Sequence, residues 1–258
     1  MQPLIDADVL RYEVGFAAET GWQQPGFPPF DYVAELLDNR IGNICACVES
    51  TKPPILFLTG KENFRFALAK RQPYKKRAGH KPWHFKNITA YMKGMYDVRI
   101  CEGLEADDLM SIFQSQNEGT IICTRDKDLR AVPGWQYGWE LGNQPSFGPE
   151  LVTETGYIKL SNDRKKIIGT GLLFFYSQCL TGDVVDSIGG LDQCGPVKAF
   201  KILDGCVDTT DAFNRVKEAY RQVYGDCGDG ELLEQGRLLW MTRELNEDGT
   251  PVLWKFPE

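Results

Sequence analysis

The chain has 258 residues, of which 42% are hydrophobic and 25% charged; this composition is ordinary for a globular protein and excludes a disordered or fibrous one. It contains no apolar run of about eighteen residues, and its opening MQPLIDADVL carries acids where a secretory signal carries basic residues. We therefore expect a cytoplasmic protein that does not associate with a membrane. The eight cysteines include no CxxC pair, so we expect reduced thiols.

The hydrophobic pattern of the first half of the chain alternates between strands and helices. We predict strands at residues 3–8, 55–59, 98–101 and 120–124, and helices from residue 9 to the Gly/Pro-rich stretch 21–29, from residue 30, at 87–96 and at 104–114. Alternation of this kind predicts an α/β fold with a central, mostly parallel sheet flanked by helices.

The second half of the chain is predicted to be mainly helical. Residues 133–160 are rich in glycine, proline and aromatic residues and predict a strand or two with long turns. Beyond them we predict helices at 167–180, 196–203, 210–224 and 231–245, with a Gly-rich segment at 181–196. We therefore expect an α/β core at 1–164, with a basic segment at 61–96, and a helical lobe at 165–258, packed as one compact unit.

The net charge of −7 argues at first against a nucleic-acid partner, because phosphate contacts need cations. The distribution of the charge argues otherwise. Residues 61–86 are rich in lysine and arginine and contain a single acid, Glu62. The aromatic ring of Tyr74 lies beside basic residues in PYKKR, a combination that stacks a base while binding its phosphates. A solvated basic surface is the alternative explanation.

Acidic residues follow three of the four predicted strands, at the edge where open α/β sheets bind ligands. They are Asp6 and Asp8 after the first strand, Glu102, Glu105, Asp107 and Asp108 after the third, and Asp126 and Asp128 after the fourth; a loop adds Asp183 and Asp186. Each group alone is explained by helix capping or by a solvated loop. Together, so many like charges require cations, and oxygen ligands without a Cys or His set favour Mg²⁺ or Mn²⁺. Two such ions would support an in-line displacement at phosphorus.

The same residues resemble the flap endonuclease and 5′–3′ exonuclease family, which has a PIN-like (FEN-like) fold, and most closely the short exonucleases of podovirus-type phages. The resemblance runs from residue 4 to about 245 through LIDADVL, LEADD, TRDKD and TGDVVDSIGG. It implies a Mg²⁺-dependent 5′–3′ exonuclease or structure-specific 5′ flap nuclease with two ions, for which Mn²⁺ can substitute, in phage DNA replication or degradation. Its partners would be double-stranded DNA with 5′ ends or flaps and RNA–DNA hybrids, bound by a monomer in the host cytoplasm.

The resemblance also implies roles for individual residues. The metal ligands would be Asp6, Glu105, Asp107, Asp108, Asp126, Asp128, Asp183 and Asp186. In catalysis Asp6, Asp107 and Asp108 would act with the phosphate-steering Arg65 and with Lys75, which polarises the scissile phosphate. DNA would be bound by Arg65, Tyr74, Lys75, Lys76 and Arg77 and, in the helix-hairpin-helix (H3TH) segment GGLDQCGPVKAF, by Gly190, Gly195 and Lys198, a motif that often holds K⁺.

The sequence departs from the family pattern after the second strand, where the family usually has an aspartate and this chain has Gly60. This departure makes a catalytically weakened DNA-binding protein an alternative. A haloacid-dehalogenase-type phosphatase is another, because DADV and the strand-final Thr59 superficially match its motifs. It leaves LEADD and DKD without a role, and LLFFYSQCL is helical in pattern where that family expects a strand. A PIN-type ribonuclease is a third alternative, disfavoured because such domains are commonly shorter.

Overall fold

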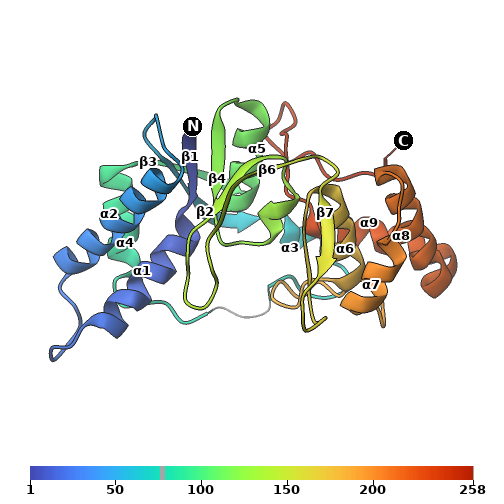
Figure 1. The fold of residues 1–258 in the computed structure, drawn as a ribbon, viewed down its shortest axis with the longest axis horizontal. Coiled ribbons are helices and arrows are strands. Elements are labelled where there is room, and N and C mark those ends of the chain that lie inside the picture. Colours follow the sequence, from blue (N-terminus) through green and yellow to red (C-terminus); the bar gives the residue numbers. More distant parts are fainter. Residues whose placement is uncertain (76–78, 258) are drawn as a thin grey trace. The chain divides into compact units, whose positions relative to one another are not determined.

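The computed structural model describes residues 1–75 and 79–257, which divide into two compact units (Figure 1). Each unit is assembled from several stretches of the chain. Unit 1 comprises Met1–Glu62, Gly79–Asp126 and Gly134–Leu151, and unit 2 comprises Asn63–Ala78, Lys127–Pro133 and Val152–Glu258. The units therefore interleave along the sequence, and each is described by itself.

The sheet of unit 1 has the strand order β3–β2–β1–β4–β5–β6. Its strands are β1 (Gln2–Asp6), β2 (Ile55–Asn63), β3 (Asp97–Gly103), β4 (Thr120–Cys123), β5 (Gly134–Gly138) and β6 (Phe147–Val152). β1 pairs in parallel with both β2 and β4, and β4 pairs in parallel with β5. The carboxyl ends of β1, β2 and β4 consequently share one edge of the sheet.

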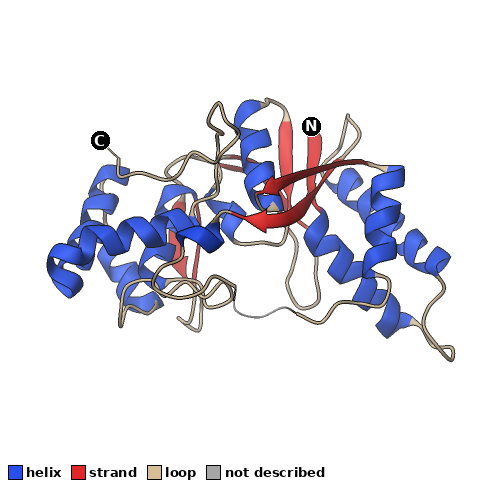
Figure 2. Cartoon of the chain, turned by 180° about the vertical axis from the view of Figure 1, so that it is seen from behind, coloured by secondary structure: helices blue, strands red, loops and turns tan. Residues whose placement is uncertain are grey.

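Helices cover both faces of this sheet: α1 (Ala7–Gly21), α2 (Phe30–Cys47) and α4 (Phe85–Met95) lie on one face and α5 (Ala106–Gln116) on the other (Figures 1 and 2). Strand side chains alternate between the two faces. Leu56 and Leu58 join the core beneath α1, α2 and α4, whereas the ring of Phe57 meets Phe113 of α5 with ring centroids 5.8 Å apart. The predicted α/β architecture is confirmed.

The first predicted strand is too long by two residues. β1 ends at Asp6, and α1 begins at Ala7 because the Asp6 side chain caps the helix, accepting a hydrogen bond from the Val9 N–H. Asp8 therefore belongs to the first turn of α1 and not to a strand.

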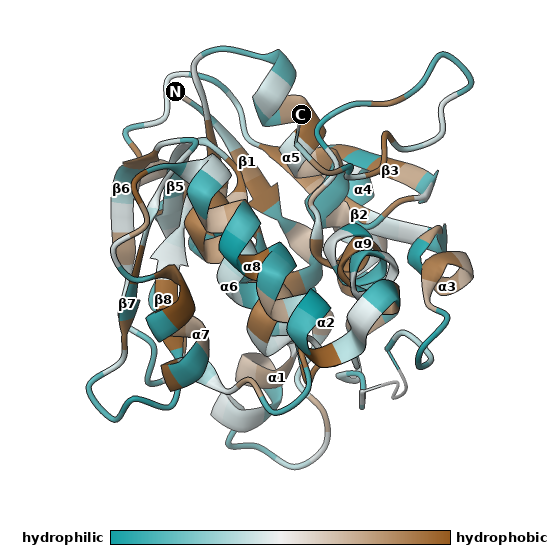
Figure 3. Cartoon of the chain, turned by 90° about the vertical axis from the view of Figure 1, so that its right-hand side faces the viewer, coloured by the Kyte–Doolittle hydropathy of each residue, from teal (hydrophilic) through white to brown (hydrophobic). Residues whose placement is uncertain are grey.

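Unit 2 is mainly helical, with one β-hairpin. Its elements are α3 (Arg65–Leu68), η1 (Asp128–Ala131), β7 (Tyr157–Leu160), β8 (Ile167–Thr170), α6 (Gly171–Thr181), α7 (Pro196–Leu203), α8 (Thr209–Tyr224), η2 (Gly225–Cys227) and α9 (Gly228–Leu239). α8 buries Phe213, Val216 and Tyr220 and exposes mainly polar residues, which gives it the alternating colours of Figure 3. Among the described residues, none of the helices has the length and hydrophobicity needed to cross a bilayer.

Two helix boundaries of the second half were predicted wrongly. The helix predicted at 167–180 begins at Gly171, because Ile167–Thr170 pairs with Tyr157–Leu160 as an antiparallel strand. The helix predicted at 231–245 ends at Leu239. The Arg65 guanidinium donates hydrogen bonds to the carbonyls of Leu238 and Trp240, and so satisfies groups at this helix end from a distant part of the chain.

The division at residue 164 also differs from the structure. Residues 63–78 of the predicted basic segment belong to unit 2, whereas residues 79–96 belong to unit 1. Contacts within unit 2 explain its extent: Arg65 is anchored to α9, and Lys127 forms an ion pair with Asp183.

Candidate active site

Asp6 is the buried acid at the carboxyl end of β1 in unit 1. One oxygen accepts a hydrogen bond from the Val9 N–H at 3.0 Å, and the other accepts one from the Thr124 hydroxyl at 2.7 Å. Burial, and after it the nearby charge of Asp8, raises the pKa of Asp6 to about 6. The ionised form of Asp6 is therefore less favourable in the folded protein than in the unfolded chain, and a nearby cation would stabilise it.

The Thr124 hydroxyl links the ends of two neighbouring strands. Besides donating to Asp6, its oxygen accepts a hydrogen bond from the Asp126 N–H at 2.9 Å. The Thr124 N–H donates to the Tyr137 carbonyl on β5. The structure thus brings the Asp6 carboxylate and the Asp126 backbone together at one edge of the sheet.

A second link joins Thr59, in the middle of β2, to the start of α5. The Asp8 carboxylate forms an ion pair with Arg11 and accepts a hydrogen bond from the Thr59 N–H at 3.1 Å. The Thr59 hydroxyl in turn accepts from the Ala106 N–H at 3.0 Å. The first turn of α5, which carries candidate ligands, is thereby fixed to the middle of β2.

Glu105 and Asp108 form a capping box at the N-terminus of α5. The Glu105 side chain accepts from the Asp108 N–H, and the Asp108 carboxylate accepts from the Glu105 N–H at 3.3 Å. Helix capping, the ordinary explanation of acids at this position, therefore applies to both residues. Asp107 lies half-buried in the same turn and takes no part in the capping box.

Gly60 has no room for a side chain. A Cβ atom built there would lie 2.5 Å from the Cys101 carbonyl oxygen and 3.1 Å from the Glu102 Cα. Because both neighbours are backbone atoms of β3, a small rotamer change could not relieve this contact. The glycine is thus explained by the close approach of β3.

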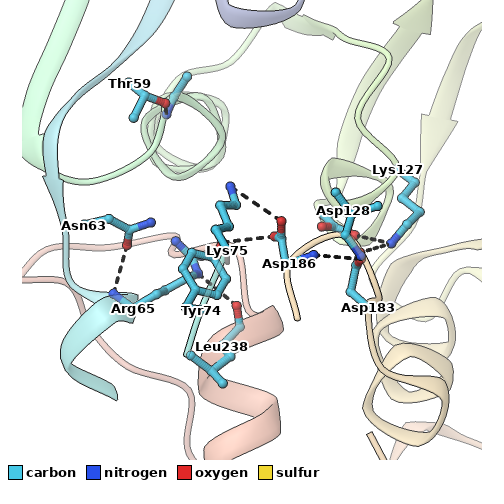
Figure 4. A network of polar contacts seen from close by, with 12 residues as sticks. Thr59, Asn63, Arg65, Tyr74, Lys75, Lys127, Asp128, Asp183, Asp186 and Leu238 are labelled. Atoms are coloured by element: carbon cyan, nitrogen blue, oxygen red, sulfur yellow. Dashed lines mark hydrogen bonds and ion pairs between the residues drawn. The ribbon is translucent and has the colours of Figure 1, made fainter. Parts of the chain in front are cut away.

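In unit 2, Asp128 and Asp183 share one cation, the ammonium of Lys127 (Figure 4). The Lys127 Nζ lies 3.0 Å from Asp128 Oδ1 and also contacts Asp183 Oδ2. Partial burial lowers the pKa of Lys127, but the charge of Asp128 and the contacts with Asp183 outweigh this effect and raise it. Lys127 therefore stays protonated over the physiological range.

Asp183 also organises the loop that it begins. Its backbone pairs with Ile188, and its Oδ1 accepts hydrogen bonds from the N–H groups of Val185 and Asp186 at 2.7 and 3.2 Å. Burial raises the pKa of Asp183, but the contacts with Lys127 and with these N–H groups have the larger, opposite effect, so the pKa is lowered overall.

Asp186 is bound by two of the residues predicted to contact DNA, Tyr74 and Lys75. The Tyr74 hydroxyl donates to Asp186 Oδ2 at 3.0 Å, and the Lys75 Nζ lies 3.7 Å from Asp186 Oδ1 (Figure 4). The Tyr74 side chain is buried in the core of unit 2, which leaves its ring no exposed face on which a base could stack. The Lys75 side chain is 39% exposed and can still meet a phosphate.

Arg65 is fully buried and has a structural role. Its Nε and Nη2 donate to the carbonyls of Leu238 and Trp240, each at 2.8 Å, and its guanidinium lies over the Phe64 ring. A side chain with no exposed surface cannot reach a phosphate in this structure.

The predicted helix-hairpin-helix residues lie in the segment between α6 and α7 and in the first turn of α7. Gly190 has φ +65°, and a Cβ there would lie 2.3 Å from the Gly182 nitrogen, so the loop requires glycine. Gly195 is the N-cap of α7, and Lys198 is exposed on the first turns of that helix. Lys76 and Arg77, also predicted to bind DNA, lie outside the described residues.

The acids of unit 1 suit a divalent ion by chemical type. Asp6, Asp107 and Asp126 offer hard oxygen donors near the carboxyl ends of strands, and the raised pKa of Asp6 indicates uncompensated negative charge. Within residues 1–75 and 79–257, however, no three His, Cys, Asp or Glu side chains are gathered into a metal site. Binding would therefore require these side chains to rotate. In unit 2 the carboxylates are already paired with lysines, and as arranged they do not suit a second ion.

Sequence reasoning missed three polar residues that organise these sites. Thr59 fixes the start of α5 and Thr124 the end of β1, and Lys127 neutralises two acids of unit 2. Lys127 could have been found from its place between the acids of DKD, and the threonines from their position at the ends of buried strands.

Comparison with known proteins identifies the fold. No family model and no curated protein matches the sequence. Among solved structures, the bacteriophage T5 protein co-crystallised with metal ions has a TM-score of 0.57 at 12% identity, covering 93% of this chain and 89% of that one. The zinc-bound T5 5′-exonuclease gives 0.57 at 13% identity, with coverages of 92% and 88%. A T5 flap endonuclease variant in complex with DNA and metal ions gives 0.51 at 11% identity, with coverages of 92% and 98%.

The chain therefore has a PIN-like (FEN-like) fold: a mostly parallel sheet flanked by helices, with a helical C-terminal region. The particular proteins with which it shares this fold are the 5′-exonuclease and flap endonuclease of bacteriophage T5. Because only 11–13% of the residues are identical, the similarity concerns the fold. The family resemblance predicted from the motifs is confirmed for the fold.

Gly60→Ala should destabilise the protein by about 1–3 kcal/mol, because the added Cβ meets the backbone of β3. Gly60→Asp should lose at least as much, so the family's usual aspartate cannot simply be restored. Gly42→Ala is the matched control, because a Cβ built on this glycine of α2 would lie in open space. The substitution should stabilise the protein by about 0.5–1 kcal/mol. Urea unfolding measures all three, and a Gly60→Asp variant as stable as the native protein would contradict the packing argument.

Asp6→Asn should stabilise the metal-depleted protein at neutral pH and not at pH 4. Since the pKa of Asp6 is raised from 3.8 to about 6 by folding, stability decreases as pH rises through this interval. The amide avoids this loss, which amounts to roughly 2–3 kcal/mol above pH 6. Thermal unfolding in EDTA at pH 4 and pH 7.5 measures the difference, and a gain of equal size at both values would refute it.

Proposed function

We propose that this protein is a divalent-metal-dependent nuclease that hydrolyses phosphodiester bonds of DNA from 5′ ends or at 5′ flaps. The observation that carries the proposal is the group of acids at the carboxyl edge of the unit 1 sheet, in a fold shared with T5 5′-exonuclease structures. Asp6 and Asp126 are linked there through Thr124, and α5 contributes Glu105, Asp107 and Asp108 from its first turn.

These acids would hold the metal ion while the surrounding groups orient them. A bound Mg²⁺, or Mn²⁺ in its place, would supply an activated water and a Lewis acid for the scissile phosphate. Thr124 fixes the rotamer of Asp6, and the contact between Thr59 and Ala106 fixes the start of α5. In unit 2 we assign Asp128, Asp183 and Asp186 to a second ion, which would have to displace the lysines that pair with them in this structure.

DNA binding is assigned to exposed groups of unit 2. Lys75 and Lys198 retain exposed side chains, and the N-terminus of α7 at Gly195 offers backbone N–H groups to a phosphate. Arg65 and Tyr74 support this surface from within: Arg65 anchors α9, and Tyr74 holds Asp186.

The finer features of the proposal follow the family resemblance. The substrate is double-stranded DNA with a 5′ end or flap, with RNA–DNA hybrids as a second substrate, and the enzyme acts as a monomer. K⁺ binds at the helix-hairpin-helix segment, and the physiological role lies in phage DNA replication or degradation. The helix α6 fills the segment in which a dehalogenase-type phosphatase requires a strand, which disfavours that alternative.

Asp107→Asn should abolish cleavage while leaving DNA binding nearly intact, because it removes a metal ligand and no phosphate contact. A loss of about 10²-fold or more in kcat is expected when one such charge stabiliser is removed. Asp31→Asn is the matched control: Asp31 is the second residue of α2, as Asp107 is of α5. This variant should cleave DNA at the native rate. Cleavage of a 5′-labelled duplex and of a 5′-flap substrate in Mg²⁺ gives the rates, and gel shifts in EDTA give the affinity.

Two results of this assay would overturn the proposal. Full turnover by Asp107→Asn would remove the metal assignment in unit 1. A native protein that binds duplex DNA but cuts neither substrate in Mg²⁺ or Mn²⁺ would be a DNA-binding protein that has kept only the fold.

A further inference from the structure

We propose that Lys127 is a resident cation of Asp128 and Asp183, and that a divalent ion binds these two carboxylates only by displacing its ammonium. The inference rests on the proposed function in one respect, the assignment of Asp128 and Asp183 as ligands of the second ion. It adds a competing group to that site, supplied by the chain itself.

The contacts of Asp183 leave an incoming ion no unengaged oxygen. Its side chain is 5% exposed, and its Oδ2 contacts the Lys127 ammonium. Its Oδ1 already accepts hydrogen bonds from the N–H groups of Val185 and Asp186. A metal ion at Oδ2 would lie beside the Lys127 ammonium and be repelled by its like charge, and an ion at Oδ1 would disrupt the loop that follows Asp183.

Asp128 is held in the same way. Its side chain is 11% exposed, and its Oδ1 accepts hydrogen bonds from both Lys127 and the Gln178 side-chain amide of α6. Two carboxylates so little exposed would destabilise each other without a cation between them. The ammonium of Lys127 supplies this charge, and the sites are stable before any ion binds.

Lys127 is also able to leave. Its side chain is 53% exposed, although its ammonium reaches two buried acids. The flexible four-carbon stem of a lysine can turn toward solvent without a change in the backbone. Displacement by an ion is therefore a side-chain rotation, and the carboxylates are neutralised both before and after it.

The test compares Lys127→Met with the native protein by thermal unfolding, first in EDTA and then with increasing Mn²⁺. In EDTA the variant should unfold about 5 °C or more below the native protein, because two buried carboxylates have lost their cation. Mn²⁺ should restore the loss, because an ion then takes the place of the ammonium between Asp128 and Asp183, and the difference between the two unfolding temperatures should disappear at saturating Mn²⁺. Lys201→Met, an exposed lysine of α7, is the control and should match the native protein in both conditions.

Unchanged stability of Lys127→Met in EDTA, or a loss that Mn²⁺ does not restore, would overturn the inference. Lys127→Gln provides an independent measurement should the methionine variant fail to fold, because it keeps a hydrogen-bond donor on a shorter side chain while removing the charge. Electron paramagnetic resonance of unbound Mn²⁺ should show more Mn²⁺ bound per molecule of this variant than of the native protein at the same free Mn²⁺ concentration, and equal or lower binding would refute the proposal. Neither measurement uses DNA, so absent nuclease activity would refute the proposed function without affecting this result.

Discussion

A carboxylate buried in a protein must receive hydrogen bonds, a proton or a cation, and the two units meet this requirement in different ways. In unit 1, Asp6 receives hydrogen bonds from Val9 and from the Thr124 hydroxyl, yet its pKa remains raised to about 6. In unit 2, Asp183 receives the charge of Lys127, and its pKa is lowered. One unit thus retains uncompensated negative charge, whereas the other contains its own counter-ion.

This difference bears on how the proposed nuclease would bind its ions. Hydrogen bonds orient the acids of unit 1 without neutralising them, which leaves that site suited to a divalent cation. Binding of the same cation to the acids of unit 2 is less favourable, because the contacts of Lys127 must first be broken. We therefore expect metal binding to begin in unit 1. The parallel pairing of β1 with β2 and β4 makes this possible, since it brings the ends of distant segments to one edge of the sheet.

The local sequence pattern correctly predicted the helices and strands that are determined by their own residues. The buried strand 120–124 and the helix Pro196–Leu203, with its proline in the first turn, were found from the sequence. The strand Ile167–Thr170 was missed because it depends on its pairing with Tyr157–Leu160. Arg65 shows the same limit within the candidate site: a basic segment indicates charge, but only the tertiary structure shows that this arginine binds the carbonyls of α9.

The central claim is that acids separated in the sequence bind a divalent ion at the carboxyl edge of the unit 1 sheet. Anomalous diffraction from a crystal soaked in Mn²⁺ tests it most directly. We expect a manganese peak bound by Asp6 together with an acid from the first turn of α5. Manganese found only at exposed surface acids, with Asp6 still bonded only to Thr124 and Val9, would contradict the account.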